Sequence, residues 1–205
     1  MTTAANRAPE QPSPRIRRAA YAGALALVPY ATMKQYWALD GSWGLPAGYA
    51  TLGDKMAADT HGRDLGPVNG AALWLYEHGV DVTVVLAALG IFLLLGLVRP
   101  WGLVFPRRLP LLAGRSVPRW LPLAPAWATA AVLAPVFGVL APVNGGLAVL
   151  GLSHPNTAGF SPFAFTIAYG GFGPFGLALG AAAWSYQRRT GRTRRTAALT
   201  PPASP

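Results

Sequence analysis

The sequence has no cysteine and few charged residues, and each shortage excludes a class of protein. Without cysteine, the chain cannot form disulfides, thiolate metal sites or cysteine nucleophiles. Charged residues make up 12% of the chain, which is well below the share found in soluble domains. No P-loop, G-x-S-x-G or dinucleotide-binding fingerprint is present. These absences argue against a soluble domain and against a recognisable catalytic site.

Apolar runs fill most of the remaining sequence, and four of them are long enough to cross a membrane. The second run has no charged residue between Val82 and Val98, so it lacks the polar stripe of a soluble helix. The first continues past Pro29 to Leu39 without a cleavage motif, which favours a span over a signal peptide. Pro135 should kink the third. We predict an all-α integral membrane four-helix bundle with spans at about 19–39, 79–98, 123–141 and 162–184.

The basic residues predict the orientation of this bundle. Fourteen of the seventeen Lys and Arg residues lie in the two tails and in the connection between the second and third runs. The positive-inside rule then places both termini in the cytoplasm. The predicted organisation is a disordered cytoplasmic tail at 1–18, a transmembrane domain at 19–186 with an outer loop at 40–78 and a cytoplasmic loop at 99–122, and a disordered basic cytoplasmic tail at 187–205.

Acidic residues and histidines lie on the opposite side of the predicted membrane. All acids except Glu10, and all three histidines, fall at or beyond the outer ends of the runs. His61, His78 and His154 are weak candidates for a metal site. Their spacing matches no zinc signature such as H-E-x-x-H, so loop histidines in solvent are the simpler interpretation. We expect no metal and no cofactor.

The end of the first run carries an aromatic box, Tyr36-Trp37-Ala38-Leu39-Asp40-Gly41. Tyr and Trp at this point are typical of an interfacial aromatic belt, and Asp40-Gly41 begins a turn. The stretch from Lys34 to Gly41 resembles the Lys-x-x-Trp-Ala-Leu-Gly-Gly-like end of the first span in a group of small four-span actinobacterial membrane proteins of unknown function. Asp40 replaces the first Gly of that pattern. The resemblance covers about the first quarter of the chain and implies no activity.

Lys34 is a charged residue inside an apolar run. It either snorkels to the membrane interface or has a structural or functional role at membrane depth. A lone charge there is costly, so we expect Lys34 to pair with Asp81 or, failing that, with Glu77, which shares a helix face with Asp81. A polar cavity open to the outside should then lie between the first, second and fourth spans. Its candidate ligand or ion-pair residues are Tyr30, Lys34, Trp37, Glu77, Asp81, Thr166 and Tyr169.

Two short motifs concern packing and turns. Gly176 and Gly180 form a GxxxG motif, which predicts that the fourth span packs closely against a neighbour without indicating a particular oligomer. Pro-Val-Asn-Gly occurs at 67–70 and again at 142–145. Because the two copies enter and leave spans at different points of the topology, we interpret them as Asn-Gly turns and not as a duplication.

Three functions are compatible with these features. The first is a non-enzymatic protein of the bacterial plasma membrane that binds a small ligand or protein partner through its outer face. The second is a small transporter or channel component, and the third is a membrane enzyme acting on a lipid or quinone. The first leads because a proton or ion path usually needs several charges within the spans, and an enzyme needs a visible acid, base or nucleophile set. The expected partners are the lipid bilayer and a second copy or another membrane protein. Nucleic acid is not expected, because the +10 net charge lies in stretches that flank apolar runs.

Overall fold

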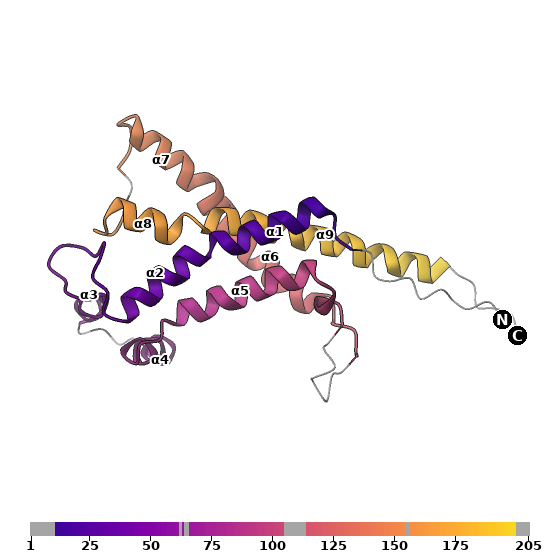
Figure 1. The fold of residues 1–205 in the computed structure, drawn as a ribbon, viewed down its shortest axis with the longest axis horizontal. Helices are drawn as coiled ribbons and strands as arrows, with labels where there is room; N and C mark the ends of the chain where they lie inside the picture. Colours follow the sequence, from indigo (N-terminus) through magenta and orange to yellow (C-terminus); the bar gives the residue numbers. More distant parts are fainter. Residues whose placement is uncertain (1–10, 62, 64–65, 105–113, 155, 200–205) are drawn as a thin grey trace, which may run out of the picture.

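The computed structural model describes residues 11–61, 63, 66–104, 114–154 and 156–199, without the side chains of 192–199. The described part is helical and holds a single isolated β-bridge, between Val104 and Ser116. This confirms the all-α class (Figure 1). The elements are α1 (Pro14–Ala26), α2 (Val28–Ala38), α3 (Leu52–Thr60), α4 (Gly66–Glu77), α5 (Val82–Val98), the 3₁₀-helix η1 (Pro100–Gly102), α6 (Trp120–Pro135), the π-helix η2 (Val136–Leu140), α7 (Ala141–Val149), α8 (Pro162–Tyr169) and α9 (Phe172–Leu199).

The first apolar run folds as two helices, α1 and α2, that meet at Leu27. Pro29 lies in the first turn of α2 and cannot donate the hydrogen bond that would continue α1. The helix also begins earlier than the predicted span, because the Ser13 hydroxyl accepts a hydrogen bond from the Ile16 N–H and caps it. Residues 14–18, predicted as disordered, are therefore helical, while residues 1–10 lie outside the described part.

The second apolar run begins at a sharp bend. Gly79 has a φ of 76° and the Val80 N–H donates to the Leu75 carbonyl, which is the Schellman ending of α4. Asp81 then caps α5 through a hydrogen bond from the Thr83 N–H. The axes of α4 and α5 differ by 98°. Helix α5 thus occupies the predicted span at 79–98 from Val82 onward, and the preceding helix turns away from it.

The third apolar run continues from α6 through η2 into α7. Pro135 ends the regular α-helix, and one turn of π-helix follows it, as expected where a proline removes a ladder hydrogen bond. In Figure 1, α7 diverges from α8, although the two are joined by the connection at 150–161. The repeated Pro-Val-Asn-Gly segments are not turns, since both lie in the first turns of helices, α4 and α7, where proline is favoured.

The fourth apolar run comprises α8 and α9, which are separated by Gly170 and Gly171. A side chain at Gly171 would collide with the Ala26 carbonyl at the junction of α1 and α2, so glycine permits this close approach. Helix α9 continues through Leu199, well beyond the predicted end of the span at residue 184. The tail predicted as disordered from 187 is therefore helical as far as residue 199.

Small residues hold the central helices together. A side chain at Gly176 would lie only 2.8 Å from the Ala134 nitrogen, and Gly180 faces the Ala130 Cβ at 3.6 Å. Gly23 of α1 is in similarly close contact with Ala178. Helix α9 is thus packed between α6 and α1. The predicted packing of the fourth run's glycine face against a neighbouring helix is confirmed.

Most basic residues lie at one end of the packed helices, and the described acidic residues lie at the other. One end, the basic end, holds the start of α1, the end of α5, the start of α6 and the α9 residues after Tyr186. Hydrogen bonds from Arg119 to the Gln187 carbonyl and from Arg189 to the Leu97 carbonyl join three of these segments. The other end, the acidic end, holds α3, α4 and the described acids, which are Asp40, Asp54, Asp59, Glu77 and Asp81.

Two stretches of the described chain are long and apolar enough to cross a membrane, at Trp120–Val149 and Pro162–Gly191. The bent pair α4 and α5 would make a third if it formed one crossing. The first run does not belong to this set. Its two helices are interrupted at Leu27 and carry Arg15, Arg17, Arg18 and Lys34.

Candidate functional site

An ion pair joins the first and second apolar runs near the acidic end. The Lys34 ammonium lies 3.1 Å from Asp81 Oδ2, and the two side chains are 15% and 4% exposed. Among the described residues, Asp81 is the only charged residue that is buried. The expected pairing of Lys34 with Asp81 is confirmed, and the lysine side chain ends on a carboxylate instead of snorkelling to the surface.

The other oxygen of Asp81 holds the start of α5. Oδ1 accepts hydrogen bonds from the Thr83 N–H at 2.7 Å and the Thr83 hydroxyl at 2.6 Å. A carboxylate at this position also interacts favourably with the positive end of the α5 dipole. One side chain therefore both caps α5 and binds the cation of α2.

Two uncharged hydrogen bonds reinforce the contact. Gln35 Nε2 donates to the Gly79 carbonyl at 2.8 Å, and the Tyr76 hydroxyl donates to the Trp37 carbonyl at 2.7 Å. We call these two bonds and the Lys34–Asp81 pair the polar joint, because together they fasten the α4–α5 bend onto α2. Sequence reasoning missed Gln35 and Tyr76, although a glutamine inside an apolar run is a signal comparable to a lysine there.

Two of the predicted site residues, Glu77 and Trp37, lie in surroundings that differ from those predicted. Glu77 is exposed at the end of α4, and the bend separates it from Asp81, so the two do not share a helix face. Trp37 is 1% exposed and packs against Phe160, while its indole N–H donates to the Trp43 carbonyl at 3.0 Å. Trp37 is therefore part of a second core at the acidic end and not a cavity wall.

Tyr30 belongs to an aromatic cluster between the first and fourth runs. Its ring lies 5.8 Å from Tyr169 and 4.5 Å from Phe172, centroid to centroid. Phe137 of η2 packs edge-on against Phe172 at 5.0 Å. The cluster brings Tyr30 and Tyr169 together as predicted, and it extends the contact to the π-helix of the third run.

A cavity of about 600 Å³ opens between α7 and α8 at the acidic end. Its polar lining comes from Asn144 of α7, the connection at 150–161 and Thr166 of α8, and its apolar lining from Phe137, Phe165 and Tyr169. The cavity exists because α7 diverges from α8 after η2. His154, considered from the sequence only as a weak metal candidate, also lines it, together with three polar residues of the connection that sequence reasoning overlooked: Ser153, Asn156 and Thr157.

The predicted cavity therefore has different walls from those expected. Thr166 and Tyr169 do line a cavity, but the third and fourth runs form it, and the first and second do not. Lys34 and Asp81 lie in the interface between α2 and α5 instead. The misplacement arises because the sequence predicts a kink at Pro135 but not the direction in which α7 then leaves the fourth run.

The histidines do not gather into a metal centre. Within the described residues, no three His, Cys, Asp or Glu side chains lie close enough together to hold a metal ion. His78 Nδ1 lies 2.7 Å from the Trp74 carbonyl, and the His78 ring stacks on the Trp74 ring. His61 follows the last residue of α3. His154 lines the cavity, and neither of the other two histidines does. Each has a separate local environment.

Comparison with known proteins gives no family assignment: no protein-family model, curated protein or solved structure matches this chain.

Proposed function

We propose that the chain is a four-span protein of the bacterial plasma membrane, with both termini in the cytoplasm, that binds a small neutral ligand in the cavity between α7 and α8. The spans would be α1–α2, α5, α6–η2–α7 and α8–α9. Their alternating direction, which leaves basic residues at one end and acidic residues at the other, supports this arrangement. The basic end would face the cytoplasm and the cavity would face outward.

The observation that carries the ligand proposal is the chemistry of the cavity lining. The described residues that line the cavity present hydroxyl and amide groups together with three aromatic rings, and none of them is Asp, Glu, Lys or Arg. A charged ligand would lose its hydration there without gaining a counter-charge. A neutral molecule with an aromatic or aliphatic body and a few hydrogen-bonding groups fits both kinds of wall.

The polar joint supports a structural role over a transport role for Lys34 and Asp81. Both charged groups are used in holding α5 and the α4–α5 bend against α2. Two opposite charges in direct contact make a structural fastening and leave no unpaired charge for an ion path. We therefore propose that the activity lies in the cavity and that the joint keeps the surrounding helices in place.

Two adjacent glycines provide a matched test. Gly145 lines the cavity and Gly146 does not, and a side chain at either position would meet nothing within 4 Å. Purified protein in nanodiscs is screened by thermal shift against neutral aromatic and aliphatic alcohols, amides and quinones. We expect hits that Gly145→Trp abolishes and Gly146→Trp retains. A library without a hit, or hits that survive Gly145→Trp, would contradict the proposal.

A further inference from the structure

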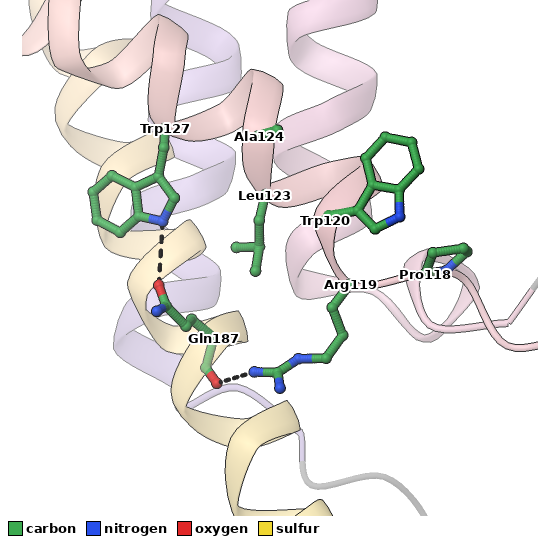
Figure 2. Close-up of a pocket in the computed structure, with 7 residues that line it drawn as sticks. All are labelled: Pro118, Arg119, Trp120, Leu123, Ala124, Trp127 and Gln187. Atoms are coloured by element: carbon green, nitrogen blue, oxygen red, sulfur yellow. Dashed lines mark hydrogen bonds between the residues drawn. The ribbon is translucent and has the colours of Figure 1, made fainter.

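At the basic end, a groove of about 660 Å³ runs between the start of α6 and α9 (Figure 2). Leu123, Ala124 and Trp127 of α6 line its apolar length, and Arg119 and Gln187 close one side. Trp120 also lines the groove and is 69% exposed. The groove is separate from the cavity of the proposed function, which lies at the opposite end of the molecule.

Arg119 is held in place but its charge is not neutralised. Nη2 donates to the Gln187 carbonyl at 2.9 Å, as Figure 2 shows. Nε is buried and makes no hydrogen bond with any described residue. Both ion pairs found in the described part, Lys34–Asp81 and Lys55–Asp59, lie elsewhere. A guanidinium fixed beside an apolar groove thus retains its full positive charge.

The surroundings favour an anion over an acidic side chain as the partner. Every Asp and Glu of the described residues lies at the acidic end, whereas Arg115, Arg119, Arg188 and Arg189 lie in segments of the basic end. Trp127 donates its indole N–H to Gln187 Oε1 at 3.3 Å, which fixes the ring as one wall. Tryptophan beside arginine at the end of an apolar helix is typical of the level of lipid headgroups.

We propose that this groove binds one anionic phospholipid, with Arg119 contacting the phosphate and the apolar faces of Leu123, Ala124 and Trp127 contacting the upper acyl chain. The ligand combines a negative headgroup with an apolar tail, and the groove presents a fixed cation next to an apolar wall. The site therefore selects for headgroup charge through one residue and for a lipid chain through the others.

The test measures binding of two lipids to the full-length protein by native mass spectrometry. We expect phosphatidylglycerol to bind more tightly than phosphatidylcholine. Arg119→Gln should weaken phosphatidylglycerol binding about fivefold, the factor that corresponds to about 1 kcal/mol for one basic residue near an anionic surface. Arg115→Gln is the matched control, because Arg115 is exposed in the same connection but does not line the groove, and it should leave the affinity unchanged.

A second pair of variants tests the groove without touching the arginine. Ala124 and Ala128 are both exposed on α6, one turn apart, and only Ala124 lines the groove. Ala124→Trp should fill the groove and abolish the tight phosphatidylglycerol site, whereas Ala128→Trp should retain it. Equal affinity for the two lipids, or tight binding that survives Ala124→Trp, would overturn the proposal. Competition by inorganic phosphate as strong as that by short-chain phosphatidylglycerol would also overturn it, since it would indicate a site for free anions.

Discussion

At the scale of single residues, the Lys34–Asp81 pair combines a buried charge contact with a helix cap. Asp81 accepts two hydrogen bonds from Thr83 on one oxygen and faces the Lys34 ammonium on the other. Burying a carboxylate is costly, and here both the counter-charge and the cap offset that cost. The pair therefore stabilises this fold only while both members are present.

The first prediction concerns this pair. Lys34→Met leaves a buried carboxylate without its counter-charge, and Asp81→Asn leaves a largely covered ammonium without one, while asparagine still caps α5. Each should lower the free energy of unfolding in detergent by about 3 kcal/mol, because an unpaired buried charge remains. The double variant should be more stable than the sum of the two losses implies.

Chemical denaturation of the parent protein, the two single variants and the double variant in one detergent gives the interaction free energy between Lys34 and Asp81 directly. Single losses that simply add would mean that the two side chains do not interact in solution. A neutral Lys34→Met would mean that the ammonium reaches the interface and contributes nothing to the joint.

At the scale of elements, glycine decides how closely α9 approaches its neighbours. Gly176 faces main-chain atoms of α6, which cannot move aside, whereas Gly180 faces a methyl group at an ordinary contact distance. The two glycines of one GxxxG motif therefore have different roles. Only the first is required by the packing.

The second prediction follows from this difference. Gly176→Ala should destabilise the bundle by about 1–3 kcal/mol, because the added methyl would lie too close to Leu133 and Ala134. Gly180→Ala should be neutral or slightly stabilising, since alanine is the better helix former and only meets Ala130 in van der Waals contact. Thermal unfolding in detergent distinguishes the two, and equal melting temperatures for both variants would contradict the packing of α6 on α9.

At the scale of the whole molecule, the separation of charge between the two ends determines how the protein should sit in a membrane. Arginines cluster where α1 and α6 begin and α5 ends, and the described acids lie at the far end. Helices that run alternately between these ends return the chain to the basic end after an even number of crossings.

The third prediction is the topology. Reporter fusions after Asp59 and after Gly159 should be active outside the cytoplasm, and fusions after Gly114 and Arg195 should be active inside. A single reversed site would show that one expected span does not cross the membrane. The two segments in question are α1–α2, which is not among the candidate spans, and the bent pair α4 and α5.

Much of the polar joint could be predicted from the sequence. Lys34 stands out because a charge in an apolar run needs a partner, and Asp81 immediately precedes the charge-free stretch that begins at Val82. The bend before it was also visible in principle, since Gly79 and Asp81 are typical of a helix end followed by a helix cap. The hydrogen bonds from Gln35 to the Gly79 carbonyl and from Tyr76 to the Trp37 carbonyl depend on how α2 lies against the bend and were not predictable.

The sequence by itself determined the helical class, the apolar runs and the distribution of charge, because these depend on composition and on local spacing along the chain. Only the tertiary structure decided where the cavity and the basic groove lie. Pro135 predicts a kink, yet the direction in which α7 leaves the bundle depends on the packing of Gly138, Gly173 and Gly176 between α9 and the third run. A cavity is the space left between elements, so its walls depend on helix crossings that no single segment encodes.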